Sequence, residues 1–489
     1  MTLAIWVATA TTGVLFLLCQ LRFVVLMCVS RQRPASPLGD LDSPFIAIQI
    51  ATYRESLVLS ALLDAIAQLD WPREKLMVQI LDDSPGEEAL RIDAIVAEHA
   101  ARNLPVSCHR RGSREGFKAG ALNHGLQIAG RADYIAYFDA DCRPDAHFLR
   151  RVMPYFVDTQ VGAVQARWRF PNATSSPLTA LQAAAFEYLF AYDYPIRSRL
   201  GLQAYYLGSA AVWRRAVPIA LGGWHFRPFT AEDVDMGLRA SSAGWKIAYQ
   251  AEILAEDDAV EDILAFRAQQ RRWAQTVLRA GLTAMPSLPC SRQRPLATLM
   301  DLTSFAPHAL VPLTPLLTSC LALWVLWRIP AATNFFWCFT ALMAISPATV
   351  ALGLAQKILH PCEWRTRVDL LLRAGPYAAA TMSSFLFGFL DFLCPEKLEF
   401  VATPKAGRTG VIGGQKMAWL RAHVGPIALD GGFGVLFGAA AAMATYDGAM
   451  SALLPLIQMS ILFLASGTLT AIALLQRSQL DDSSARESE

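Results

Sequence analysis

Apolar residues in the first half of the chain occur in short runs, and each run is followed by a polar turn and a longer stretch of helical periodicity. The short runs are residues 45–51, 76–81 and 134–138, and the helical stretches are residues 57–69, 87–101 and 145–156. Repeated strand–turn–helix units predict a parallel sheet covered by helices. Because ligands bind outside the carboxyl ends of parallel strands, we expect the functional residues directly after each strand.

Apolar residues in the second half of the chain form much longer segments. No ionised side chain occurs between Asp301 and Arg328, between Arg328 and Lys357, or between Asp447 and Arg477. Each gap is longer than the roughly 20 residues that a helix needs to cross a bilayer. These gaps predict three membrane-spanning helices.

Three weaker segments complete this prediction. Residues 3–21 are uncharged and no positive region precedes them, which favours a retained anchor over a cleaved signal peptide. Residues 424–446 form a further span, although Asp430 interrupts it. Residues 374–390 are uncharged but short and contain Pro376, which favours an interfacial or re-entrant helix against the cytoplasmic leaflet. We therefore expect about five spans.

Composition supports a membrane protein and excludes several function classes. Of the 489 residues, 54% are hydrophobic and 17% are charged, against about 25% charged residues in soluble domains. The length allows two or three domains. The net charge of +2 predicts no nucleic-acid partner. The nine cysteines are spread singly, which argues against a disulfide framework and a zinc site and suits a reducing compartment.

Acidic residues follow three of the predicted strands. The strand-end residues are Thr52, Tyr53 and Glu55 after the first run, Asp82 and Asp83 after the second, and Asp139 and Asp141 after residues 134–138. One such group alone also caps helices or turns the chain. Three at one edge of a sheet indicate a divalent cation and a nucleotide, because Mg²⁺ takes carboxylate oxygens together with substrate phosphates.

Two later motifs have an ordinary structural interpretation as well as a functional one. Glu232 and Asp233 begin a helical stretch, where acidic side chains also complement the helix dipole. Gln269, Arg272 and Trp273 precede the apolar half, where basic and aromatic side chains also anchor a protein at the membrane interface.

Taken in order, these motifs resemble the membrane-embedded family-2 glycosyltransferases, which include cellulose, hyaluronan and mannan synthases and some glycolipid glucosyltransferases. The resemblance covers about residues 45–280. It includes the segment 116–123, the pair Gly208 and Ser209, and the segment 222–224. It implies an α/β domain of the GT-A fold followed by an α-helical transmembrane domain, and a nucleotide sugar as donor.

The same resemblance implies a role for each donor-side motif. Thr52, Tyr53 and Glu55 belong to the nucleoside pocket, and Asp82 or Asp83 reads the base. UDP-glucose is the default donor, with UDP-N-acetylglucosamine and GDP-mannose left open.

The resemblance also implies the following roles for a second group of residues, which take part in the transfer itself. Lys118 meets the diphosphate, and Asp139 and Asp141 hold Mg²⁺ or Mn²⁺ on it. Asp233, next to Glu232, is the general base that activates the acceptor hydroxyl. A single attack on the anomeric carbon inverts that centre, so the product is β-linked.

The acceptor end of the site is implied at Gly208, Ser209, Gln269, Arg272 and Trp273. The acceptor is a glycan or a lipid. Tyr205, Tyr206 and Leu207 stand where cellulose synthases tend to have Phe-Phe-Cys, which leaves the identity of the acceptor open.

A further match lies between the later spans. Phe400, Thr403 and Lys405 occupy the positions of a gating loop that closes over the nucleotide in cellulose synthases. A basic cytoplasmic loop that obeys the positive-inside rule is the alternative. Because nucleotide sugars are cytosolic, both interpretations put the transferase domain in the cytoplasm of a multi-pass protein of the plasma (inner) membrane, among its lipids.

The leading hypothesis is a processive β-glycan synthase that extrudes its product, and the alternative is a non-processive glucosyltransferase that makes a glycolipid. A transporter with a regulatory nucleotide domain is disfavoured, since the membrane half shows no inverted repeat. The expected organisation is an anchor (1–30), the GT-A domain (44–260), interfacial helices (261–300), two spans (301–357), an interfacial helix with the gating-like loop (358–423), two spans (424–477) and an acidic disordered tail (478–489).

Overall fold

The computed structural model describes most of the expected α/β domain and three later segments of the chain. The described residues are 43–200, 202, 206–226, 231–284, 347–393, 416–447 and 450–487, with isolated positions at 21, 24, 319, 322 and 323. The anchor, most of residues 301–357, and Phe400, Thr403 and Lys405 lie outside them.

The strands of the described residues form one mixed sheet in the order β3-β2-β1-β4-β7-β6-β8-β5. Their bounds are β1 (Ile46–Thr52), β2 (Leu76–Asp82), β3 (Val106–His109), β4 (Tyr134–Tyr137), β5 (Arg143–Pro144), β6 (Val161–Arg169), β7 (Ala211–Arg214) and β8 (Lys246–Glu256). Strands β1 to β4 are adjacent in this order and pair with one another in parallel. Strand β7 is antiparallel to both β4 and β6, so the prediction of a parallel sheet holds for one half only.

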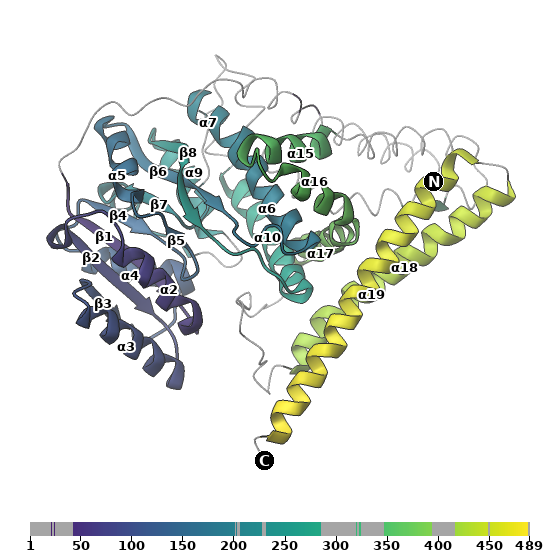
Figure 1. The fold of residues 1–489 in the computed structure, drawn as a ribbon, viewed down its shortest axis with the longest axis horizontal. Coiled ribbons are helices and arrows are strands. Elements are labelled where there is room, and N and C mark those ends of the chain that lie inside the picture. Colours follow the sequence, from purple (N-terminus) through teal and green to yellow (C-terminus); the bar gives the residue numbers. More distant parts are fainter. Residues whose placement is uncertain are drawn as a thin grey trace.

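Helices cover both faces of this sheet (Figure 1). Those of the α/β domain are α2 (Ser56–Ala67), α3 (Gly86–Ala101), α4 (Phe117–Ile128), α5 (Phe148–Val152), α6 (Pro177–Tyr188), α7 (Tyr194–Leu200), α8 (Ala216–Ala220), α9 (Glu232–Ser242) and α10 (Ile263–Ala284). Alternate residues of β1 enter opposite cores: Ile48 belongs to the core that includes residues of α2 and α3, and Ala47 belongs to the core that includes residues of α4 and α9. Burial on both faces explains why the strand reads as a continuous apolar run.

Of the later helices, three lie beside the α/β domain, and the long pair α18 and α19 extends away from it (Figure 1). The later helices are α15 (Pro347–Leu359), α16 (Trp364–Arg373), α17 (Gly375–Leu393), α18 (Lys416–Tyr446) and α19 (Met450–Glu487). Two segments in the described part of the chain, Val424–Tyr446 and Leu456–Arg477, are long and apolar enough to cross a membrane. They coincide with the last two predicted spans, while the count of five is not confirmed.

One predicted helix differs from the observed structure. Residues 145–156 form a short helix, α5, followed by a 3₁₀ turn over Met153–Val157. Pro154 lacks the backbone N–H that a continued α-helix would use, which accounts for the change of geometry.

Candidate active site

The predicted strand-end residues meet at one edge of the sheet. Strands β1, β2 and β4 are parallel neighbours, and Thr52 lies opposite Asp82 in their register. The backbone N–H of Asp83 donates to the carbonyl oxygen of Thr52 at 3.1 Å. Asp139 and Asp141 follow β4 directly, so the same edge carries both acidic groups.

Three arginines that the sequence analysis did not single out contact residues of the expected nucleoside pocket. Arg111 forms a bidentate ion pair with Asp83, with N–O distances of 2.9 and 2.5 Å. The Nε of Arg110 donates to buried Asp82 at 2.8 Å. The guanidinium of Arg114 lies 3.4 Å from the centre of the Tyr53 ring, a cation–π contact. The sequence could have indicated these contacts, because three arginines within five residues follow β3 at the same edge of the sheet.

Thr52 and Glu55 lie beside these pairs. Thr52 is buried, and its Oγ1 has no hydrogen-bond partner within the described part of the structure. Glu55 is the N-cap residue of α2, and its carbonyl oxygen accepts from the N–H groups of Val58 and Leu59. A buried hydroxyl without a partner is unusual in a folded protein and suits a site that a polar ligand completes.

Lys118 connects the donor and acceptor sides of the site. Its Nζ donates to Asp139 Oδ1 at 2.5 Å and to the carbonyl oxygen of Gly208 at 3.1 Å. Burial lowers the pKa of Lys118, but the nearby carboxylates of Asp139, Glu232 and Asp233 outweigh it and raise the pKa overall. The amine is therefore charged at neutral pH, as a contact to a diphosphate requires.

Asp139 and Asp141 fit a divalent cation shared with a diphosphate. They lie two residues apart on one turn, and the side chain of Asp139 is 33% exposed. Among the described residues no group of three His, Cys, Asp or Glu side chains could hold a metal ion. Mg²⁺ is commonly bound by one or two carboxylates plus substrate phosphates, and Asp139 and Asp141 supply two carboxylates.

Asp233 has the environment of a general base. It lies in the first turn of α9, and the backbone N–H of Val234 donates to its Oδ1 at 2.7 Å. Burial, followed by the charge of Glu232, raises the pKa of Asp233 to about 7, although Lys118 opposes the shift. A carboxylate with a pKa near the working pH is well suited to accept a proton from an acceptor hydroxyl.

Gly208 and Ser209 lie next to Asp233 and Asp139, respectively. The backbone N–H of Asp139 donates to Ser209 Oγ at 2.9 Å. Gly208 has a φ of +82°, and a Cβ there would lie 2.7 Å from Asp233 Oδ2. A glycine is needed because both the backbone conformation and the contact with the carboxylate exclude a side chain.

Replacing Gly208 by alanine should therefore displace the Asp233 carboxylate. We expect turnover to fall about 10²-fold, the effect of a misplacement of about 1 Å, with the KM for the donor nearly unchanged. Gly244 is a matched control, since its φ is +88° and its Cβ would meet nothing within 4 Å. Steady-state rates for both variants check this, and equal losses would show that backbone strain alone is responsible.

Helix α10 carries the predicted acceptor motif, Gln269, Arg272 and Trp273. Burial lowers the pKa of Arg272, and the charges of Glu232, Asp139 and Asp233 oppose that shift. Trp273 packs edge-on against Phe186 of α6, with ring centroids 5.5 Å apart. The Oε1 of Gln269 is buried and has no hydrogen-bond partner in the part of the chain that is described.

The two glycine-containing motifs form one unit. The side-chain amide of Asn123, in α4, donates to the carbonyl oxygen of Trp224 and accepts from its N–H, both at 2.7 Å. Gly223 has a φ of +83°, and a Cβ there would lie 2.5 Å from Asn123 Oδ1. Segments 116–123 and 222–224 therefore fix α4, and with it Lys118.

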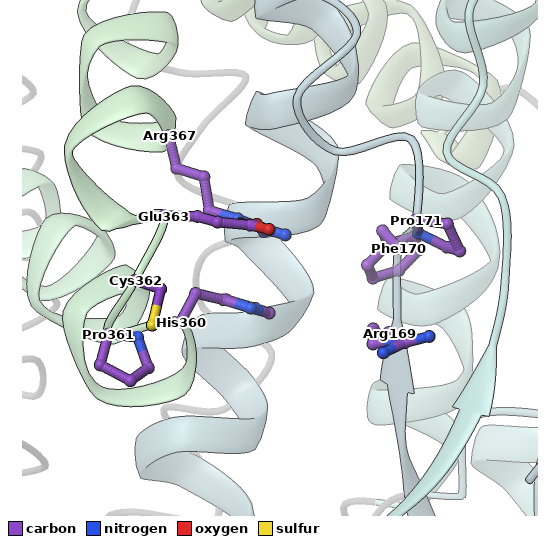
Figure 2. A pocket seen from close by; sticks show the side chains of 8 residues that line it. All are labelled: Arg169, Phe170, Pro171, His360, Pro361, Cys362, Glu363 and Arg367. Atoms are coloured by element: carbon purple, nitrogen blue, oxygen red, sulfur yellow. Dashed lines mark hydrogen bonds and ion pairs between the residues drawn. The ribbon is translucent and has the colours of Figure 1, made fainter.

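A separate cavity of about 350 Å³ lies away from these residues, between the end of β6 and the junction of α15 and α16 (Figure 2). His360 and Arg367 on its helical side both contact Glu187 of α6, at 2.6 and 3.0 Å. Glu187 is fully buried. These contacts fasten the later helices to the α/β domain, and none of the predicted site residues lines the cavity.

Comparisons with known proteins match the α/β domain. A family model described as "Glycosyltransferase like family 2" matches residues 43–276. Glucomannan 4-beta-mannosyltransferase 1 of Oryza sativa subsp. japonica is 36% identical over 243 residues, which cover 48% of this chain and 46% of that protein. Probable glucomannan 4-beta-mannosyltransferase 10 of Arabidopsis thaliana is 34% identical over 241 residues, covering 48% and 44%. The match therefore spans less than half the length of these curated relatives.

A solved structure has the same fold over a larger part of the chain. It is a mannosyltransferase from Pyrobaculum calidifontis in complex with GDP-Man and Mn²⁺. The TM-score is 0.58 at 18% sequence identity, and the match covers 81% of this chain and 99% of that one. The likeness supports the GT-A fold expected for the α/β domain.

Proposed function

We propose that residues 43–276, which match the glycosyltransferase family 2 model, form a transferase domain, and that the protein transfers a hexose from a nucleotide sugar to a growing β-linked glycan at the membrane. The convergence of Lys118, Asp139, Asp233 and Arg272 from four separate elements carries the proposal. These residues supply a base, a carboxylate for a cation and two cationic groups in one place.

In the proposed reaction, Asp233 takes the proton of the acceptor hydroxyl. The hydroxyl oxygen forms a bond to the anomeric carbon while the bond from that carbon to the nucleoside diphosphate breaks, which inverts the centre. Lys118 and Arg272 stabilise the negative charge that develops on the leaving diphosphate. A divalent cation on Asp139 and Asp141 would add Lewis-acid stabilisation of the same charge.

We propose GDP-mannose as the donor. The names of the curated relatives describe mannosyl transfer, and they give the default of UDP-glucose no support. Purified protein in detergent, with separate GDP-mannose, UDP-glucose and UDP-N-acetylglucosamine reactions, tests the choice. Release of GDP above the Asp233→Asn background supports mannosyl transfer, and turnover of a uridine nucleotide alone would contradict it.

The acceptor is proposed to be a polysaccharide that is extended processively. The contacts of α10 with α17 and α18 support this proposal, because they put the helix of the acceptor motif beside the later helices. Extraction of radiolabelled product distinguishes the alternatives, since a polymer stays in the aqueous or insoluble fraction and a glycolipid enters chloroform. Label found only in chloroform would establish glycolipid synthesis instead.

The gating-like loop lies outside the described residues and stays a prediction. If it closes over the donor, it excludes water and contacts the diphosphate, so Thr403→Ala and Lys405→Ala should lower turnover strongly. Arg408→Ala and Arg421→Ala, the latter in the first turns of α18, are matched controls, because the positive-inside rule counts all basic residues near the membrane together. Transfer rates at equal expression decide, and equally small effects in all four variants would refute the gate.

A further inference from the structure

Helix α10, which carries the acceptor motif, holds a buried arginine that faces the later helices. Arg267 lies two residues before Gln269, and only 2% of its surface is exposed. Its guanidinium forms an ion pair with Asp430 of α18. It also donates to Thr470 Oγ1 at 2.9 Å and to Ser383 Oγ at 2.9 Å. A fourth partner, Ser466 Oγ, lies at 2.8 Å.

These partners come from three different helices. Ser383 belongs to α17, Asp430 to α18, and Ser466 and Thr470 to α19. Ser466 Oγ also donates to Asp430 Oδ2 at 2.7 Å. One side chain of the transferase domain therefore joins all three helices, and the planar guanidinium fixes the directions of these hydrogen bonds.

Asp430 explains the interruption in its predicted span. It lies within the apolar segment Val424–Tyr446 and is fully buried. A carboxylate at such a position is costly unless it is paired, and ionisable residues within spans are a sign of function. Its Oδ1 has no hydrogen-bond partner in the described part of the molecule, so the desolvation cost is not fully offset. Stability alone is therefore a weak reason for the pair.

Close helix packing surrounds the same pair. A Cβ on Gly388 of α17 would overlap the carbonyl oxygen of Arg271 and lie 2.8 Å from Ala274 Cβ, so α17 rests directly on the backbone of α10. Arg271 also forms a bidentate ion pair with Asp391, at 2.5 and 2.8 Å. Helix α10 is thus held by charge and by contact within two turns of the acceptor motif.

We propose that Arg267 is a positioning residue: through Asp430 and the three hydroxyl groups it fixes α10 on α17, α18 and α19, and so sets Gln269, Arg272 and Trp273 relative to Asp233. The inference rests on the proposed function, since it assigns a purpose to the position of the acceptor motif. It makes the later helices part of the acceptor geometry, whereas the expected nucleoside pocket is built on residues that follow β1 and β2.

The test replaces the whole pair by apolar residues of similar size, Arg267→Met with Asp430→Leu. Loss of one partner alone would leave an unpaired buried charge and destabilise the fold strongly, whereas apolar replacement of a buried pair is often tolerated. We expect kcat for transfer to fall about 10²-fold and the KM for acceptor to rise, with the KM for the nucleotide sugar nearly unchanged. Arg373→Gln, which removes an exposed ion pair with Asp369, is the control and should keep normal rates.

A second variant moves α10 without changing any charge. Gly388→Ala should press α17 away from the backbone at Arg271 and produce the same selective loss of kcat. Hydrogen exchange of residues 263–284 gives a readout that does not need activity: it should speed up in both variants and stay unchanged in Arg373→Gln. Unchanged exchange in α10, or wild-type transfer by the double variant, would overturn the inference. A wild-type protein that uses no donor would instead refute the proposed function, and the exchange measurement would still decide the role of Arg267.

Discussion

Replacing Asp233 by asparagine is expected to abolish sugar transfer while leaving donor binding nearly intact. The amide keeps the size of the side chain and its hydrogen bond from the N–H of Val234, but it cannot accept the proton of the acceptor hydroxyl. General-base assistance is worth about 10²–10⁴-fold, and loss of the sole base belongs at the upper end of that range. Transfer rates and donor titrations on the purified variant check this, and near-normal turnover would contradict the role of Asp233.

The pH dependence gives the same assignment a second test. Asp233 acts as a base only when it is deprotonated, and its pKa is raised to about 7, so transfer should increase as the pH rises through 7. The charge of Glu232 contributes to this raised pKa. Glu232→Gln should therefore move the acid limb of the rate profile to lower pH. An acid limb that does not move would show that another group controls the profile.

Chelation of divalent cations is expected to stop transfer completely, and addition of Mg²⁺ or Mn²⁺ should restore it. The leaving diphosphate brings charge to a site that already holds the carboxylates of Asp139, Glu232 and Asp233, as the raised pKa of Lys118 indicates. Without a cation, Lys118 and Arg272 must balance all of that charge. Rates in EDTA and after back-titration with each metal give the measurement.

Asp141→Ala should raise the metal concentration needed for half-maximal activity or abolish turnover. Asp145→Ala is a matched control, because this carboxylate follows in the same segment and pairs with Arg151 on the surface. Full activity in chelator, or equal metal requirements in the two variants, would show that Asp139 and Asp141 serve the fold alone.

The local order of the sheet could be predicted closely, but its second half could not. Strands β1, β2 and β4 begin and end within about two residues of their predicted bounds, because strands buried on both faces form continuous apolar runs. Strand β5, of two residues, exists only because it pairs with β8 more than 100 residues later. No local pattern encodes such a pairing, and the same holds for the antiparallel insertion of β7.

The sequence likewise predicted one part of the candidate site, the residue types, and not the other part, their contacts. The motifs at Asp139, Asp233 and Arg272 were evident as residue types at recognisable spacing, and the position of the first after a strand follows from the rule for parallel sheets. The contacts of Lys118 with Gly208, 90 residues away, and of Arg111 with Asp83 depend on the path of the chain. A charged side chain shows in the sequence, whereas its partner does not.

Asp430 illustrates the difference most clearly. In the sequence it is a charged residue within an apolar segment, and it lowers the hydropathy of that segment, which weakens the prediction of a membrane span. In the structure it is buried against Arg267, 163 residues earlier, with hydroxyl groups from two further helices around the same guanidinium. Periodicity along a chain records which face of an element is buried, because burial acts on each side chain separately. The choice of a charged partner depends on which elements pack together, and only the tertiary structure decides that.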